Sequence, residues 1–195
     1  VVYILQKKSG NKQPIFARAA KLEPRNFNAQ YGHGVSLQMM KRFVEAIRAY
    51  HRALTIAPED VGANLNIATT YLQMGRPKSA VVFAERAVEM CGEEAPVHIT
   101  LAATYQLLGR MDDALAEYIA ASEMMDEPSP QLMRNIIYLL TQEKRYRELV
   151  NTTEQLVRVD PSSSSYELLG WPQFRLGDYS SSSSAYITAV EFDEE

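Results

Sequence analysis

One pattern occurs twice in the middle of the chain, at a fixed interval of 34 residues. Residues 64–76 read NLNIATTYLQMGR and residues 98–110 read HITLAATYQLLGR, so Tyr71 recurs as Tyr105 and Gly75 recurs as Gly109. The interval continues beyond this segment, where Ala80 is matched by another alanine 34 residues later. A fixed period of this length is typical of architectures built from stacked repeats. It predicts that the same pair of helices packs in the same way in each copy.

The same frame extends in both directions. Upstream, Pro24 and Pro58 keep the 34-residue interval, and downstream the frame resumes one residue late at Leu149 and closes at Pro161. We therefore expect about five copies of one unit between residues 27 and 192, preceded by an incomplete leading copy. The expected boundaries are 1–26 for the partial leading repeat and 27–195 for the array, which divides into 27–60, 61–94, 95–129, 130–162 and a degenerate last repeat at 163–192.

The unit resembles the tetratricopeptide repeat, a helix-turn-helix of 34 residues with small and aromatic residues at set places. The residues that carry the resemblance are Ile67, Ala68, Tyr71, Ala80, Ala84 and Ala87 in one copy, and Leu101, Ala102, Tyr105, Ala114, Tyr118 and Ala121 in the next. The resemblance implies an all-α fold, a right-handed α-solenoid of tandem helix-turn-helix units stabilised by stacking of neighbours. It implies much less about function, because one fold hosts many unrelated activities.

Several copies depart from the pattern. In the first copy, Gly32 and Gly34 lie inside the expected first helix, where each glycine costs up to about 1 kcal/mol relative to alanine. Gly34 stands where the family has a small residue for close helix contact, whereas Gly32 has no evident packing reason unless a ligand approaches the backbone there. The fourth copy has Lys144 in place of the turn glycine.

The fifth copy departs furthest. Pro172 falls inside its expected first helix, at a cost of about 3 kcal/mol or a kink. The serine tracts at 162–165 and 180–184 resemble flexible low-complexity sequence more than a packed helix. Two interpretations stay open, a degenerate terminal repeat and uncertain sequence in a poorly defined region.

The composition restricts the partners. Acidic residues outnumber basic ones by 24 to 20, which argues against a nucleic-acid backbone as the main partner and weakens the related RNA-binding helical repeats as an alternative. The single cysteine, Cys91, excludes an internal disulfide, and no apolar run approaches the roughly 18 residues that a membrane span needs. The start at Val1 fits a truncated repeat helix or the end of a membrane anchor or signal sequence. The compartment stays open between the cytoplasm and, if the N-terminus is truncated, a periplasmic or anchored setting.

The sequence shows no pattern typical of catalysis or metal binding. His33, His51 and His98 have neither a carboxylate nor a second histidine three or four residues further on. Cys91 has no nearby histidine in sequence that would activate it, and no glycine-rich phosphate loop occurs. We therefore expect that the chain is not an enzyme, and we expect no metal and no cofactor.

The resemblance implies a concave face lined by the first helix of each repeat. This face is nearly uncharged and mixes apolar side chains with amides and hydroxyls. Asn66 and Asn135 hold the place where peptide-binding members use asparagine to grip a ligand's backbone, since an amide donates and accepts at once. The predicted partner-binding residues are Tyr31, Gln38, Leu65, Asn66, Thr69, Gln73, Ile99, Thr100, Gln106, Arg134, Asn135 and Tyr138. Val35, Met39, Ala103 and Gln142 hold further places on the same face.

The expected function is a non-catalytic scaffold or adaptor that binds a peptide segment or a partner protein in this groove. The family's clamp for the acidic tail of heat-shock chaperones is not expected, because the places where lysine, arginine or asparagine would be needed hold Tyr31, Val35, Pro96 and Thr100. Two alternatives stay open: a chaperone for a secreted or unfolded client, and the regulatory segment of a larger enzyme. Self-association through the ends of the array also stays open.

Overall fold

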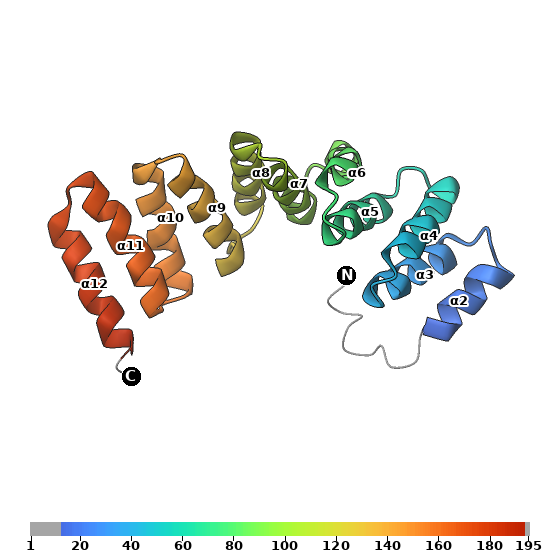
Figure 1. Cartoon of the computed structure of the whole chain (residues 1–195), viewed down its shortest axis with the longest axis horizontal. Helices are drawn as coiled ribbons and strands as arrows, with labels where there is room; N and C mark the ends of the chain where they lie inside the picture. Colours follow the sequence, from blue (N-terminus) through green and yellow to red (C-terminus); the bar gives the residue numbers. More distant parts are fainter. Residues whose placement is uncertain (1–12, 194–195) are drawn as a thin grey trace. The chain divides into compact units, whose positions relative to one another are not determined.

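The computed structural model describes residues 13–193 of the 195-residue chain. Every regular element in that range is an α-helix. In chain order they are α2 (Gln13–Leu22), α3 (Phe27–Met39), α4 (Phe43–Ile56), α5 (Val61–Gln73), α6 (Pro77–Met90), α7 (Ala95–Leu107), α8 (Met111–Glu123), α9 (Pro130–Gln142), α10 (Tyr146–Val159), α11 (Ser163–Leu176) and α12 (Tyr179–Asp193) (Figure 1). The predicted fold class, an all-α solenoid of tandem helix-turn-helix units, is confirmed.

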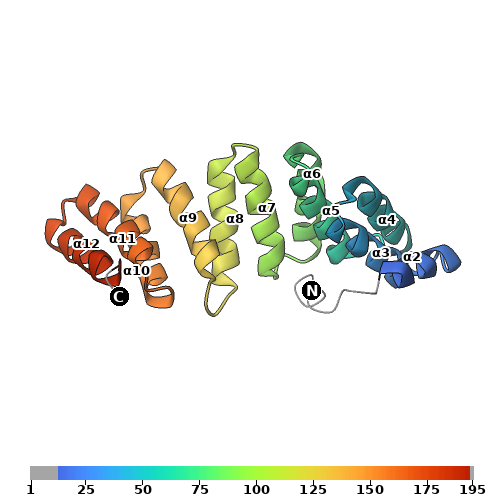
Figure 2. The ribbon, with the colours of Figure 1, turned by 60° about the horizontal axis from the view of Figure 1, so that its bottom comes forward.

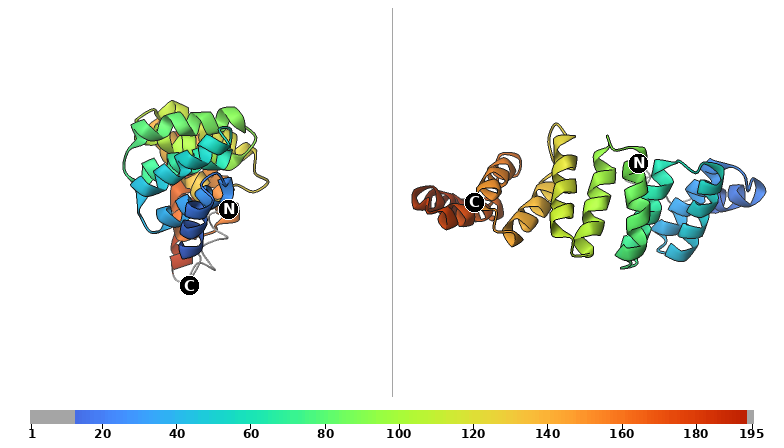
Figure 3. Two further views of the ribbon diagram at one scale, coloured as in Figure 1. Left: turned by 90° about the vertical axis from the view of Figure 1, so that its right-hand side faces the viewer. Right: turned by 90° about the horizontal axis from the view of Figure 1, so that it is seen from above.

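The helices belong to two compact units, divided between Arg110 and Met111. In the first unit each helix from α2 to α7 packs on the next, and the first helices also meet directly, α3 with α5 and α5 with α7. In the second unit each helix from α8 to α12 packs on the next. Figures 2 and 3 show this order within each unit from other directions. Each unit is therefore stabilised by stacking of neighbouring helices rather than by one central core.

The turns inside the hairpins share one backbone geometry. The φ angle is positive at Lys41 (59°), Gly75 (68°), Gly109 (78°), Lys144 (58°) and Gly177 (84°). The next amide closes each turn on a carbonyl five residues earlier, as from Arg42 N to Leu37 O and from Arg76 N to Tyr71 O, both at 2.9 Å. This closure of a helix end by a left-handed residue favours glycine, which has no Cβ. The two lysines adopt the same turn without that advantage.

Glycine inside α3 makes room for two aromatic rings. A Cβ on Gly34 would lie 2.6 Å from the ring of Tyr50, which is fully buried, and a Cβ on Gly32 would lie 2.5 Å from the ring of Phe16. The packing expected at Gly34 is therefore present. The expectation that Gly32 has no packing reason was wrong, because the Phe16 ring of α2 occupies the space of its missing side chain.

The serine tracts of the fifth copy are helical, so their interpretation as flexible sequence was wrong. Ser163 to Ser165 begin α11, and Ser180 to Ser184 lie within α12. Ser182, which holds the place of Ala80 and Ala114, is buried, and its hydroxyl donates to the carbonyl of Gly170 at 2.9 Å. α11 also continues through Pro172.

The two interpretations of the N-terminal segment, a truncated repeat helix or the end of an anchor, fall on residues outside the described range. Within residues 13–193, no helix combines the length and the hydropathy that crossing a membrane requires.

Candidate functional site

Nine of the predicted partner-binding residues lie in the first unit, on α3, α5 and α7. We call the side of these three helices that carries them the first-helix face of the first unit. Two hydrogen bonds between side chains join α3 to α5 across this face. Ile99, Thr100 and Gln106 lie on α7 and are half-buried. The nine residues are Tyr31, Gln38, Leu65, Asn66, Thr69, Gln73, Ile99, Thr100 and Gln106.

The first of these bonds joins Asn66 to Tyr31. Asn66 is only 6% exposed, and its Nδ2 donates to the Tyr31 hydroxyl at 2.8 Å. Tyr31 stacks on Phe27 with ring centroids 5.6 Å apart, and burial raises the pKa of its phenol, which stays neutral at ordinary pH. Asn66 therefore links two helices of the protein, and a grip on a ligand's backbone by its amide stays a prediction.

The second bond is part of a short chain of polar groups. The Tyr50 hydroxyl donates to Gln38 Oε1 at 2.7 Å, and Gln38 Nε2 donates to Gln73 Oε1 at 3.2 Å. Gln73 is exposed. Because its oxygen is already bound, the orientation of its amide is set, and its Nε2 donors point to a partner or to water.

The threonine hydroxyls on this face are turned toward their own helices. Thr69 donates to the carbonyl of Leu65, and Thr100 donates to the carbonyl of Pro96 at 2.9 Å. Their donors are thus in use, and a ligand meets their oxygens as acceptors and their methyl groups as apolar surface. Val35 does not belong to the face, because it is buried in the cluster around Tyr50.

A second set of polar residues, at intervals of 34, has a structural role that the sequence analysis missed. Gln30 Nε2 donates to the carbonyl of Ala20 at 3.0 Å, Asn64 Nδ2 donates to that of Asp60 at 2.9 Å, and His98 Nε2 lies 3.0 Å from that of Gly92. Asn64 and His98 each fasten a first helix to the turn before it, and Gln30 fastens α3 to the last turn of α2. His98 is therefore a packing residue, and residues 13–193 hold no cluster of three or more histidine, cysteine or acidic side chains that could bind a metal.

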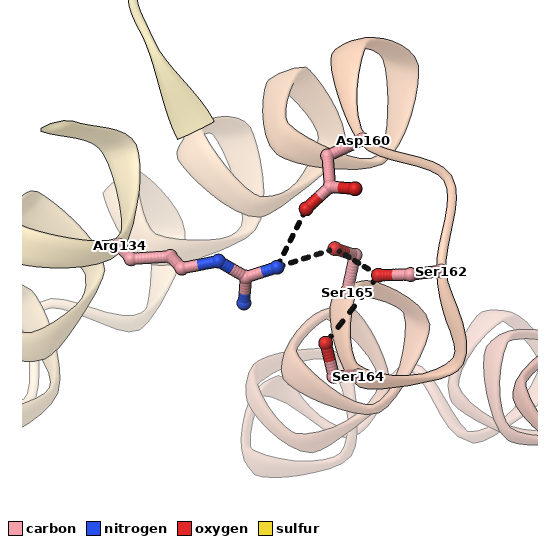
Figure 4. A network of polar contacts seen from close by, with 5 residues as sticks. All are labelled: Arg134, Asp160, Ser162, Ser164 and Ser165. Atoms are coloured by element: carbon pink, nitrogen blue, oxygen red, sulfur yellow. Dashed lines mark hydrogen bonds and ion pairs between the residues drawn. The ribbon is translucent and has the colours of Figure 1, made fainter. Parts of the chain in front are cut away.

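Arg134, in the second unit, is held within the protein. Its Nη2 lies 2.7 Å from Asp160 Oδ2 and 3.3 Å from Ser165 Oγ, and Ser165 is bonded in turn to Ser162 at 2.9 Å (Figure 4). The guanidinium thus joins α9 to Asp160 at the end of α10 and to Ser165 at the start of α11. A partner that used Arg134 would have to compete with this pair.

The other two predicted residues of the second unit differ in exposure. Asn135 Oδ1 accepts from Gln131 Nε2 at 3.1 Å, and its side chain also bonds the phenol of Tyr118, whose pKa is raised by burial. Tyr138 is 49% exposed, and no hydrogen bond of its hydroxyl is seen among the described residues. Tyr138 is therefore the predicted residue of this unit that is most available to a partner.

A cleft of about 430 Å³ opens between α9 and α11, with α10 at its base. Its lining residues are Ile137, Thr141, Leu149, Ser164, Glu167, Leu168 and Trp171. Glu167, Leu168 and Trp171 follow Ile99, Thr100 and Ala103 by two periods of 34, so they belong to the same first-helix places. They are not among the predicted residues because the fifth copy departs furthest from the repeat pattern, although the 34-residue frame leads to them.

One wall of this cleft is fixed by aromatic contacts. The rings of Trp171 and Tyr146 meet edge to face with centroids 5.5 Å apart. The guanidinium of Arg175 lies 5.0 Å from the Tyr146 centroid and 5.8 Å from the Trp171 centroid. Contacts of this kind favour one orientation of the indole.

Comparison with known proteins agrees with this architecture. A sequence model of the tetratricopeptide repeat matches residues 37–90. This match assigns residues 37–90 to the tetratricopeptide repeat, and the 34-residue period and the helical hairpins continue the same pattern along the rest of the described chain. A search of curated proteins finds no match in sequence.

Solved structures share the fold. YrrB, described as a tetratricopeptide-repeat protein with an unusual peptide-binding site, superposes with a TM-score of 0.78 at 15% identity, over 92% of this chain and 93% of that one. MamA superposes with a TM-score of 0.77 at 17% identity, over 86% of this chain and 92% of that one. Cut9, from the Cut9–Hcn1 hetero-tetramer, gives 0.69 at 13% identity, over 98% of this chain and 38% of that one.

Proposed function

We propose that the chain is a non-catalytic protein-interaction module that binds a peptide segment of a partner protein on its first helices. The observation that carries the proposal is the chemistry of the first-helix face of the first unit, where all nine predicted residues are uncharged. An extended peptide offers N–H and C=O groups at every residue, and the Nε2 of exposed Gln73 can donate to such a carbonyl. Half-buried Leu65 and Ile99 add apolar contact.

The hydrogen bonds across this face support the proposal. Because Asn66 holds Tyr31 and Gln38 holds Gln73, the surface is ordered before a partner arrives. A surface that is ordered in advance loses less conformational entropy on binding, which favours affinity. The peptide-binding site named for YrrB, which has the same fold, is consistent with this use of the repeats.

The perturbed ionisable groups have structural explanations. Burial raises the pKa of Tyr31 and Tyr50, and it lowers the pKa of His33. Hydrogen bonding to Arg42 lowers the pKa of Glu45 in a surface ion pair. These shifts follow from packing and capping, so the proposal assigns none of these groups to catalysis.

Selection of displayed random peptides by the full chain tests the proposal. We expect bound peptides to be selected by the wild-type protein and to bind at least about tenfold less tightly to Leu65→Glu/Ile99→Glu, because each change puts a charge on the apolar part of the face. The matched control is Val44→Glu/Val82→Glu, which changes two exposed valines on second helices. Circular dichroism checks that all variants stay helical. Equal loss in both double variants, or loss in neither, would move the site off this face.

A further inference from the structure

We propose that the cleft between α9 and α11 is an anchor site for one large apolar side chain of a partner peptide that carries a lysine or arginine beside it. The inference rests on the proposed function, since it assumes a peptide partner. It adds the chemistry of that partner's binding segment and a place for it in the second unit.

The lining of the cleft favours a large apolar side chain as its occupant. Four of its seven lining residues are apolar, namely Ile137, Leu149, Leu168 and Trp171, and their three helices pack directly as α9 on α10 and α10 on α11. Aromatic and aliphatic pockets of this kind bind the anchor side chains that dominate peptide recognition. Because Tyr146 and Arg175 already hold Trp171, the pocket is formed before the ligand arrives.

The hydroxyl groups in the lining do not change this character. Thr141 donates to the carbonyl of Ile137 at 2.7 Å, and the hydroxyl of Ser164 lies 3.3 Å from that of Ser162. Both groups therefore have partners within the protein, so the cleft presents chiefly hydrocarbon to its occupant.

The charges at the cleft favour a lysine or arginine beside that apolar side chain. Glu167 is exposed among the lining residues, and its carboxylate makes no hydrogen bond or ion pair in the part of the chain that the structure describes. The nearby Arg134 is already paired with Asp160, and Arg175 lies over the rings of Tyr146 and Trp171. Glu167 is the one ionisable residue in the lining, so the charge that the lining itself presents is negative, which favours a cationic residue in the ligand.

Charge also favours a different protein over a second copy of this chain as the occupant. The chain carries a formal charge of −4 at neutral pH. Two copies that met at this acidic cleft would repel each other, whereas a basic peptide is attracted to it.

The test uses the peptides selected by the full chain. We expect peptides that occupy this cleft to contain a large apolar residue next to lysine or arginine. Their binding, followed by fluorescence anisotropy, should weaken about tenfold or more in Trp171→Ala, because the wall of the anchor pocket is removed. Glu167→Lys should reverse the charge preference, so that peptides with aspartate or glutamate beside the anchor bind better than basic ones. The matched control Glu154→Lys, an exposed charge on α10, should leave both preferences unchanged.

Each other outcome overturns the inference in a recognisable way. If peptides bind and respond to Leu65→Glu/Ile99→Glu but to neither change in the cleft, the proposed function stands and the anchor site is wrong. If light scattering shows a dimer that Glu167→Lys changes, the occupant is a second copy and the peptide anchor is wrong. If the wild-type chain selects no peptide, the proposed function and the inference are both wrong.

Discussion

Tyr50 is fully buried because Gly34 leaves room for its ring. The ring has little freedom to move, since its hydroxyl is bonded to Gln38 at 2.7 Å. We expect Gly34→Ala to lower the free energy of unfolding by about 1–3 kcal/mol through overpacking, which exceeds the gain of up to about 1 kcal/mol in helix propensity. Urea denaturation followed by circular dichroism measures the change.

The second copy of the repeat supplies a control for this prediction. It has Ala68 and Ala84, both fully buried, in the places of Gly34 and Tyr50. Once Tyr50→Ala has removed the ring, Gly34→Ala should cost nothing, so a double-mutant cycle should show strong coupling. Additive effects would mean that the glycine is needed for another reason.

Arg134 was predicted to contact a partner, but in the structure it contacts Asp160 and Ser165. Arg134→Gln should lower the free energy of unfolding by about 0.5–1 kcal/mol, because it breaks a pair that is about one-third exposed and partly screened by solvent. The loss should shrink as salt is added, since salt weakens the ion pair in the wild type. Thermal melts of both proteins at low and high ionic strength test this; a loss that salt does not change would rule out the ion pair as its source.

At the scale of the helical hairpin, the turns allow a comparison within one chain. Lys41 and Lys144 adopt the left-handed conformation that Gly75 adopts in the same turn. A left-handed residue with a Cβ costs about 1–2 kcal/mol, and glycine loses about 0.5–1 kcal/mol through the greater freedom of the unfolded chain. We therefore expect Lys41→Gly and Lys144→Gly each to raise stability by about 0.5–1 kcal/mol in thermal denaturation.

The opposite substitution is the control for the turns. Gly75→Lys should destabilise by a similar amount, about 0.5–1 kcal/mol by the same two opposing effects. No atom outside the neighbouring residues lies within 4 Å of where a Cβ would stand on Gly75, so a steric clash with the rest of the protein is not involved. If Gly75→Lys stabilised the protein, or if Lys41→Gly and Lys144→Gly destabilised it, the backbone conformation would not explain the stability of these turns. The charge of the side chain would then be the cause.

The helices were more predictable than the surfaces they present. Repetition identified Gly75 as the turn glycine, and its φ angle is positive in the structure. A serine tract carries weak helix propensity, but stacking on a neighbour overrides it in α12. The single-sequence pattern also places Asn66 on a first helix without showing which neighbour its amide binds, because that depends on the distance between α3 and α5.

At the scale of the whole molecule, substantial contacts between described helices join only elements that are adjacent in the chain or one element apart. Stability in such an array is close to a sum of local terms and nearest-neighbour terms. A substitution that destabilises one helix should therefore destabilise only the helices next to it. In a domain with one cooperative core, the same substitution would destabilise the whole domain.

Two matched substitutions in different units test this expectation. Leu156 in α10 and Ile67 in α5 are both fully buried, and truncation of either to alanine should cost about 2–5 kcal/mol locally. In amide hydrogen exchange with mass spectrometry, Leu156→Ala should speed exchange in α9, α10 and α11 and leave α3 unchanged. Ile67→Ala should give the reverse, with faster exchange in α4, α5 and α6 and no change in α12. If either variant accelerated exchange evenly from α2 to α12, the chain would unfold as one cooperative body. A destabilising substitution in one unit would then also destabilise the first helices of the other unit.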